Sequence, residues 1–480
     1  MKRFLIVLAV LLGLLLLAGI AVVFLVDVNV YKSRIESAVS GALGMEFRIR
    51  GKAGIRLLPP AGVSFSDLQL RNRGTDLASA ETLKVGVKLL PLLSRRVEIT
   101  ELILENPVFR IEKEAAGRFN TWTPPALKKP GEKEPEGQGI PLAVASAAVK
   151  NGTLVYVDQK DGAKADISGV ELTVDDLSLP AGAGVPAAKA IRFSGTLKIK
   201  KLRSGGLAVS DIEARVVAAD GVYDVKPFNM ELFGGKGQGE IRADLSGGIT
   251  DVTANYTLSN FRAEESLAAA GKPRYLRGPL TLSERLSFRG KGANEMKRTL
   301  SGQVSLRGEE LIAEGVDIDA VLSKASAARN LNLADVGAFV LAGPLGTAAT
   351  KAYDFGGLYE ATAQKGETRL TRLVSDWTVR NGVAEAKDVA FATRKTRIAL
   401  KGKLDLVRER FAGITVAALD ANGCAKLRQT IDGPFRKPQI DKVTTLESAV
   451  RPILGLFKET RDLLSASECK PFYSGSVQPP

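Results

Sequence analysis

Histidine does not occur anywhere in the 480-residue sequence. Its absence removes the commonest general base and the commonest metal ligand, and it excludes every nucleophile that a histidine would activate. The two cysteines, Cys424 and Cys469, form neither a Cys-x-x-Cys pair nor a zinc-type spacing. The sequence also lacks a Gly-x-Ser-x-Gly nucleophile elbow and a phosphate-binding loop of the Walker type. We therefore expect a protein that is not an enzyme and that holds no metal and no cofactor.

Aromatic residues make up only 6% of the chain, whereas glycine occurs 48 times and hydrophobic residues reach 45%. This balance is typical of many short strands joined by tight turns. The formal net charge of +14 in principle attracts nucleic acid, anionic lipid headgroups or acidic polysaccharide. The basic stretch at residues 198–203 follows an alternating strand pattern and lacks aromatic residues for base stacking. We interpret it as a solvated sheet face and expect no nucleic-acid partner.

Two pairs of aspartates, Asp317 with Asp319 and Asp175 with Asp176, are candidate cation ligands. A divalent cation bound by oxygen atoms needs more converging ligands than one such pair offers. Helix capping or a solvated strand edge is the favoured interpretation of both pairs.

An uncharged apolar run covers residues 4–26, directly after Lys2 and Arg3. As a helix it is long enough to cross a hydrocarbon core of about 30 Å. We expect residues 1–26 to form an uncleaved signal anchor rather than a cleaved signal peptide. The anchor residues include Lys2, Arg3, Phe4, Leu15 and Val26. The rest of the chain is expected outside the cytoplasm, where Cys424 and Cys469 could form a disulfide; two buried free thiols are the alternative.

The hydrophobic pattern divides the remaining chain. Residues 32–43 predict a short amphipathic helix that Gly44 stops, and from Phe47 the apolar period changes to two, as in strands. We expect a β-rich N-terminal domain over residues 27–122 and a linker rich in proline, glycine and charge over 123–141. A β-repeat body over 142–443 follows, with a helical insert near 316–341, and then a C-terminal helix and tail over 444–480.

The β-repeat body carries clear turn and strand signals. Asn151-Gly152 and Asn381-Gly382 predict tight hairpin turns. The cleanest alternation puts Ile191, Phe193, Leu197 and Ile199 on one face of a strand, and Arg192, Lys198 and Lys200 on the other. Similar runs recur, without a fixed period, at residues 239–245, 252–258, 280–290, 300–308 and 398–406. The pattern predicts a mainly β protein with an N-terminal transmembrane helix and a few short helices.

Four stretches of the chain, in order, resemble the AsmA family of outer-membrane biogenesis proteins. The stretch that begins Ile55-Arg-Leu-Leu-Pro-Pro is similar to the family's opening strand pair. The stretch over residues 91–107 leads to Gly117-Arg-Phe-Asn-Thr-Trp122, which resembles a Gly-x-x-Asn-Trp signature with one extra residue before the tryptophan. Residues 300–308 and 314–319 resemble the central repeat. Residues 431–438 and 472–477 resemble the C-terminal region.

The resemblance implies an inner-membrane-anchored periplasmic protein whose elongated sheet curls into an apolar groove and helps to move phospholipid, with acyl chains in the groove. Representative groove-lining residues would be Ile191, Phe193, Leu197, Ile199 and Leu404. A further outer-membrane or periplasmic protein partner is expected. Because alternating strands leave one apolar face, the residues themselves are compatible with this function.

Two other functions remain open. One is a non-catalytic scaffold or chaperone-like factor for outer-membrane protein assembly, which would use exposed strand edges and which a filled apolar interior would favour. The other is a binder of anionic polysaccharide or lipopolysaccharide through the positive charge.

Overall fold

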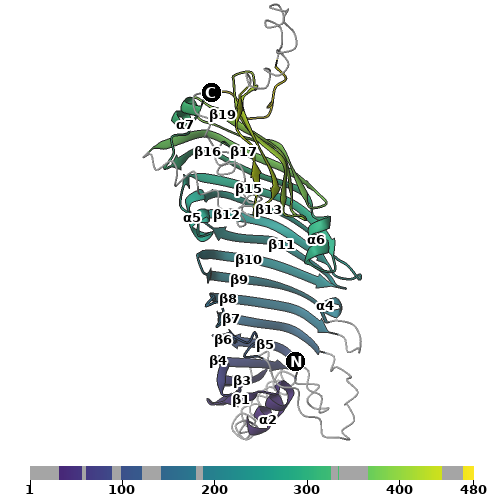
Figure 1. Cartoon of the computed structure of the whole chain (residues 1–480). Coiled ribbons are helices and arrows are strands. Elements are labelled where there is room, and N and C mark those ends of the chain that lie inside the picture. The colour runs from purple at the N-terminus through teal and green to yellow at the C-terminus, as the bar shows by residue number, and fades with distance from the viewer. Residues whose placement is uncertain are drawn as a thin grey trace, which may run out of the picture. The chain divides into compact units, whose positions relative to one another are not determined.

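The computed structural model describes residues 32–56, 61–88, 99–121, 142–179, 187–325, 333, 366–445 and 469–480. Within these residues the protein is mainly β with few short helices (Figure 1). It comprises two compact units, residues 1–227 and 228–480. The predicted anchor at 1–26 and the predicted linker at 123–141 lie outside the described residues. No helix in the described part of the chain is long and apolar enough to cross a membrane.

The first unit begins with one helix and continues as a mixed sheet. Its elements are α2 (Lys32–Leu43), β1 (Glu46–Ile49), β2 (Ala53–Arg56), β3 (Gly62–Asn72), β4 (Thr75–Val87), β5 (Ile99–Glu105), β6 (Val108–Lys113), β7 (Leu142–Asp158), β8 (Lys164–Leu179), α4 (Ala187–Ala190), β9 (Arg192–Ser204) and β10 (Leu207–Ala219). Strands β5 and β6 run parallel to β7. The other pairs, from β1 with β3 to β9 with β10, are antiparallel.

The predicted helix over residues 32–43 is confirmed as α2. It ends at Gly44, whose φ of +66° suits glycine because glycine has no Cβ to clash in the left-handed region. Ile35 of this helix packs against a small core formed by Ile49, Phe65, Leu68 and Ala80. The helix therefore covers the apolar face of the first strands.

The second unit is an antiparallel sheet in every pair that the described residues form. Strand β11 (Val222–Leu232) spans the boundary between the units. The elements that follow are β12 (Gly235–Asp244), β13 (Thr250–Arg262), α5 (Ala263–Ala269), β14 (Leu276–Arg277), β15 (Pro279–Gly290), α6 (Ala293–Thr299), β16 (Ser301–Glu314), α7 (Ile318–Ala325), β17 (Glu367–Arg380), β18 (Val383–Ala392), β19 (Arg397–Asp405), β20 (Arg410–Leu419), β21 (Ala425–Pro434), β22 (Gln439–Ile440) and β23 (Thr444–Thr445). From β15 to β21, each long strand pairs with the next one in sequence.

The two predicted Asn-Gly hairpins have different outcomes. Asn381 and Gly382, with φ of +50° and +74°, join β17 to β18, so this prediction is confirmed. The prediction for Asn151-Gly152 is wrong, because both residues lie inside β7, where the register with β8 shifts. Hydrogen bonds to residues on both sides of β7 keep Asn151 within the strand. The Asn151 N–H donates to the Glu171 carboxylate (2.9 Å), and the Asn151 side chain donates to Asn106 (2.7 Å). Asn151, at φ +52°, therefore forms a bulge instead of a turn.

The first part of the predicted helical insert, near residue 316, is helical in the structure. Helix α7 begins at Ile318, and Asp317 caps it by accepting a hydrogen bond from the Ala320 N–H (2.9 Å). Of residues 326–341, only Leu333 is described. The predicted C-terminal helix does not begin at Thr444, because Thr444 and Thr445 pair with β21 as strand β23; residues 446–468 lie outside the described part.

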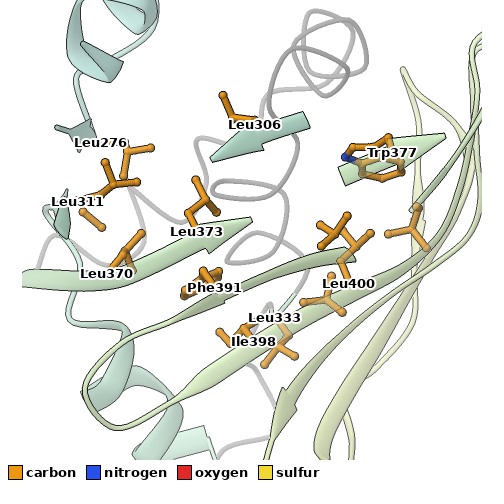
Figure 2. Packing of buried hydrophobic residues seen from close by; sticks show 14 of the residues in the cluster. Leu276, Leu306, Leu311, Leu333, Leu370, Leu373, Trp377, Phe391, Ile398 and Leu400 are labelled. Atoms are coloured by element: carbon orange, nitrogen blue, oxygen red, sulfur yellow. The ribbon is translucent and has the colours of Figure 1, made fainter. Parts of the chain in front are cut away.

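The interior of the second unit is filled by protein side chains. Leu370, Leu373, Phe391 and Ile398 are 0% exposed and pack in one cluster that also contains Leu333 (Figure 2). The opposite face of the same strands carries small residues, including Ala390, Ala392, Ala399 and Ala417. Tyr473 and Val477 cover that face. We name residues 469–480 the C-terminal strap.

A disulfide between Cys424 and Cys469 ties the start of the C-terminal strap to the residues just before β21. Replacing both cysteines by serine is expected to lower the free energy of unfolding of the second unit by about 2–4 kcal/mol, because the bond restricts the unfolded chain. Denaturant unfolding followed by tryptophan fluorescence, to which the buried Trp377 contributes, measures the change. An unchanged midpoint would show that the strap stays in place without the bond.

Candidate functional site

Four neighbouring strands of the first unit present a continuous apolar face. The strand register aligns Val149, Leu172, Leu197 and Ala214 in one row across β7, β8, β9 and β10. The next row contains Val170, Ile199 and Ile212, and the row beyond contains Leu154, Ile167, Leu202 and Val209. Phe193 lies opposite Ala218 toward the other end of the strands. We name these side chains the first apolar face.

Much of the first apolar face is accessible to solvent. Phe193, Leu197 and Ile199 are only half-buried, and so are Leu172 and Ile212. Among the described helices, those with substantial strand contacts lie elsewhere: α2 on β1, α5 on β13 and β14, and α6 on β15. Contiguous apolar surface of this kind marks a site that binds an apolar partner.

The opposite face of the same strands is polar. Glu171, Lys198 and Glu213 form a row, with 3.2 Å between the Lys198 Nζ and a Glu213 carboxylate oxygen. Arg192, Lys198 and Lys200 are exposed, as the alternation predicts for a solvated face. The charges of residues 198–203 thus belong to a mixed surface of both signs.

Residues with positive φ interrupt β8 and β10 between the second row and the third. Gly169 in β8 (φ +64°) and Asp211 in β10 (φ +48°) lie beside Lys200, and the strand register is the same on both sides of them. In β9 the half-buried residues there are Ile199 and Leu202, three positions apart, with exposed Lys200 and Lys201 between them. These interruptions were not predicted from the sequence, although Asp and Gly inside strand patterns are the signal that marks such irregular positions.

The amino-acid sequence that forms this sheet matches a known protein family. The sequence profile of the AsmA family matches residues 1–191 and 144–389. The chain belongs to the AsmA family. Membership implies a role related to outer-membrane biogenesis and lipid transport in the cell envelope, and the family is generally non-catalytic. None of the curated proteins compared matches the chain.

The second unit of this AsmA-family chain carries its own half-buried apolar surface. It lies on the face of β12, β13 and β15 that continues into the core of the second unit, and we call the positions on this face inward. We name its half-buried side chains the second apolar face. Its members include Ile241, Val252, Ala254, Tyr256, Leu282, Leu286 and Phe288, all half-buried. It ends at Val304 and Leu306 of β16, which are 3% and 4% exposed, and at Leu258 of β13 and Leu280 of β15, which are 4% and 5% exposed. The filled core begins there.

The structure separates the five predicted lining residues of this AsmA-family chain. Phe193, Leu197 and Ile199 lie on the first apolar face, and half-buried Ile191 directly precedes β9. Leu404 is only 4% exposed and packs in the core of the second unit. Lys2, Arg3, Phe4, Leu15 and Val26 lie outside the described residues. In the described part of the chain, no group of three or more His, Cys, Asp or Glu residues is arranged to hold a metal ion.

Proposed function

We propose that this protein binds phospholipid by its acyl chains along the first apolar face, as one section of a lipid-conducting groove in the cell envelope. The observation that carries the proposal is the alignment of half-buried apolar side chains in successive rows across β7–β10. Covering such side chains with an acyl chain gains about 25 cal/mol per Å² of apolar area. Binding of this kind needs no catalytic residue.

The proposed setting is the periplasm, with residues 1–26 as the anchor in the inner membrane. Two observations support it: the apolar run at residues 4–26 and the disulfide between Cys424 and Cys469. Disulfides persist in oxidising compartments and are rare in the cytosol. An outer-membrane or periplasmic protein partner would receive or supply the lipid.

The scaffold function has one observation in its favour, the filled interior of the second unit. The half-buried rows of the first unit favour lipid binding there, because a scaffold that pairs through strand edges has no need of an uncovered sheet face. The two functions differ in whether lipid contacts Leu197.

Site-specific photocrosslinking tests this contact. A photoreactive phenylalanine analogue at Leu197 of the full-length, detergent-purified chain is expected to crosslink to phospholipid vesicles at least about tenfold more than the same analogue at Lys198, because adjacent strand residues point to opposite faces. Mass spectrometry of the crosslinked protein quantifies the lipid. Equal labelling at both positions would refute an acyl-chain site on this face, and crosslinks from Leu197 only to protein would support the scaffold.

A further inference from the structure

One carboxyl group interrupts the second apolar face. Glu284 occupies an inward position of β15, between Leu282 and Leu286 of the same strand. The register places Tyr256 of β13 on one side of it and Val304 of β16 on the other. Glu284 is the one charged residue among the paired inward positions of β12, β13, β15 and β16.

The Glu284 carboxylate has no hydrogen bond or ion pair among the described residues. Burial raises the pKa of this carboxyl group, and no neighbouring charge offsets the effect. A carboxylate in apolar surroundings is costly unless something pairs with it. Every other inward position nearby is apolar or tyrosine, so these described strands supply no cation to it.

An aromatic residue, Tyr256, is the cross-strand neighbour of Glu284. The Tyr256 ring lies over Gly237 and Gly239 of β12, where a Cβ atom on either glycine would clash with it. The Tyr256 hydroxyl is buried and has no hydrogen-bond partner among the described residues. Burial, and then the charge of Glu284, raise the pKa of Tyr256 to about 12, so the phenol is neutral. A carboxylate and an aromatic side chain at paired positions of neighbouring strands are both groups that attract an ammonium.

Glu284 also lies close to the filled core of the second unit. Leu286 and Phe288 of β15 are half-buried, whereas Leu258 of β13, Val304 and Leu306 of β16 and Trp377 of β17 are at most 4% exposed. An acyl chain on the second apolar face has no room beyond β15. The polar headgroup of that lipid would therefore meet a polar residue where the open face stops.

We propose that Glu284, beside Tyr256, binds the primary ammonium of an aminophospholipid headgroup whose acyl chains lie on the second apolar face. The inference rests on the proposed lipid-binding function and adds a headgroup preference to it. Glu284 provides a negative charge for the ammonium group of such a lipid. The half-buried leucines beside Glu284 provide apolar contacts for its acyl chains.

Competition between two lipids tests the headgroup preference. The full-length chain with a photoreactive analogue at Leu286 is incubated with vesicles of equal amounts of phosphatidylethanolamine and phosphatidylglycerol with identical acyl chains. Phosphatidylethanolamine is expected to exceed phosphatidylglycerol in the crosslinked product by about tenfold, as a charge-assisted contact predicts. Glu284→Gln, which keeps the shape of the side chain, is expected to bring the ratio to about one without loss of total crosslinking. Glu240→Gln, which removes a carboxylate from the opposite face, is the matched control and should keep the preference.

The outcomes separate this inference from the proposed function. A ratio of about one in the unmodified chain, or an unchanged ratio in Glu284→Gln, would overturn the headgroup site while lipid binding stands. Loss of lipid crosslinks from both Leu286 and Leu197 in the unmodified chain would overturn both. The preference should also disappear as the pH falls through the raised pKa of Glu284, since only the carboxylate attracts an ammonium; Tyr256, the other titratable group facing it, stays neutral throughout.

Discussion

Phe193→Asp together with Leu197→Asp is expected to reduce the phospholipid that co-purifies with the full-length chain by at least about tenfold. Both side chains lie on the first apolar face and are half-buried. An acyl chain placed over two carboxylates would have to remove water from both charges, and a loss of only about 1.4 kcal/mol already corresponds to tenfold in affinity. Mass spectrometry of lipids extracted from equal amounts of purified protein gives the ratio.

The matched control for this double variant is Lys198→Asp with Lys201→Asp. These residues are exposed in the same strand, and their replacement changes the net charge in the same direction and by more. Lipid should remain at the level of the unmodified chain. Equal loss in the control would point to the net charge as the cause, and retention of lipid in a folded Phe193→Asp, Leu197→Asp variant would refute the proposed site. Circular dichroism verifies that both variants keep their β structure.

Tyr473→Ala is expected to lower the free energy of unfolding of the second unit by about 4 kcal/mol. Tyr473 is 6% exposed, and its hydroxyl donates to Asp388 and accepts a hydrogen bond from the Val477 N–H (3.0 Å). The Arg397 guanidinium lies 5.6 Å from the ring centroid and donates to the Val477 carbonyl (3.1 Å). Removal of the ring leaves a cavity and deprives Asp388 of a donor. Denaturant unfolding measures the loss, and a change below about 1 kcal/mol would contradict the role of the strap.

Tyr473→Phe separates the hydrogen bond from the packing. Burial alone would raise the pKa of Asp388, but hydrogen bonds from Ser476 and Tyr473 outweigh burial and lower it. A carboxyl with a lowered pKa stabilises the fold above its unfolded pKa, and that stabilisation is lost as the pH falls through the folded value. Tyr473→Phe should therefore cost about 1–3 kcal/mol near neutral pH and make stability less sensitive to acid. An acid sensitivity equal to that of the unmodified chain would argue against the Tyr473–Asp388 contact.

Local chemistry made several features predictable from the sequence. The helical spacing of apolar residues and the glycine that follows them predicted α2. The Asn381-Gly382 dipeptide predicted a hairpin turn, and Asp317 predicted the start of α7. Alternation in residues 191–200 also separated the apolar side chains from the charged ones correctly. Each of these features depends on backbone preferences within a few residues, which a sequence displays directly.

Other features depended on neighbours distant in sequence. The Asn151 bulge forms because Asn106 and Glu171, on the two sides of β7, bind a residue that in isolation favours a turn. Leu404 and Phe193 have similar alternating surroundings in sequence, yet Leu404 is enclosed by the core of the second unit and Phe193 is half-buried.

The sequence by itself determined the mainly β class, the absence of histidine chemistry and the presence of one apolar and one polar side in each alternating strand, because these follow from composition and period. Only the tertiary structure decided which apolar sides are filled, that Asn151 forms a bulge inside β7, and that Glu284 is the cross-strand neighbour of Tyr256 on a half-buried apolar face. The physical reason is that burial is a property of the elements packed against a strand, and a one-residue shift in register moves every side chain to the other face.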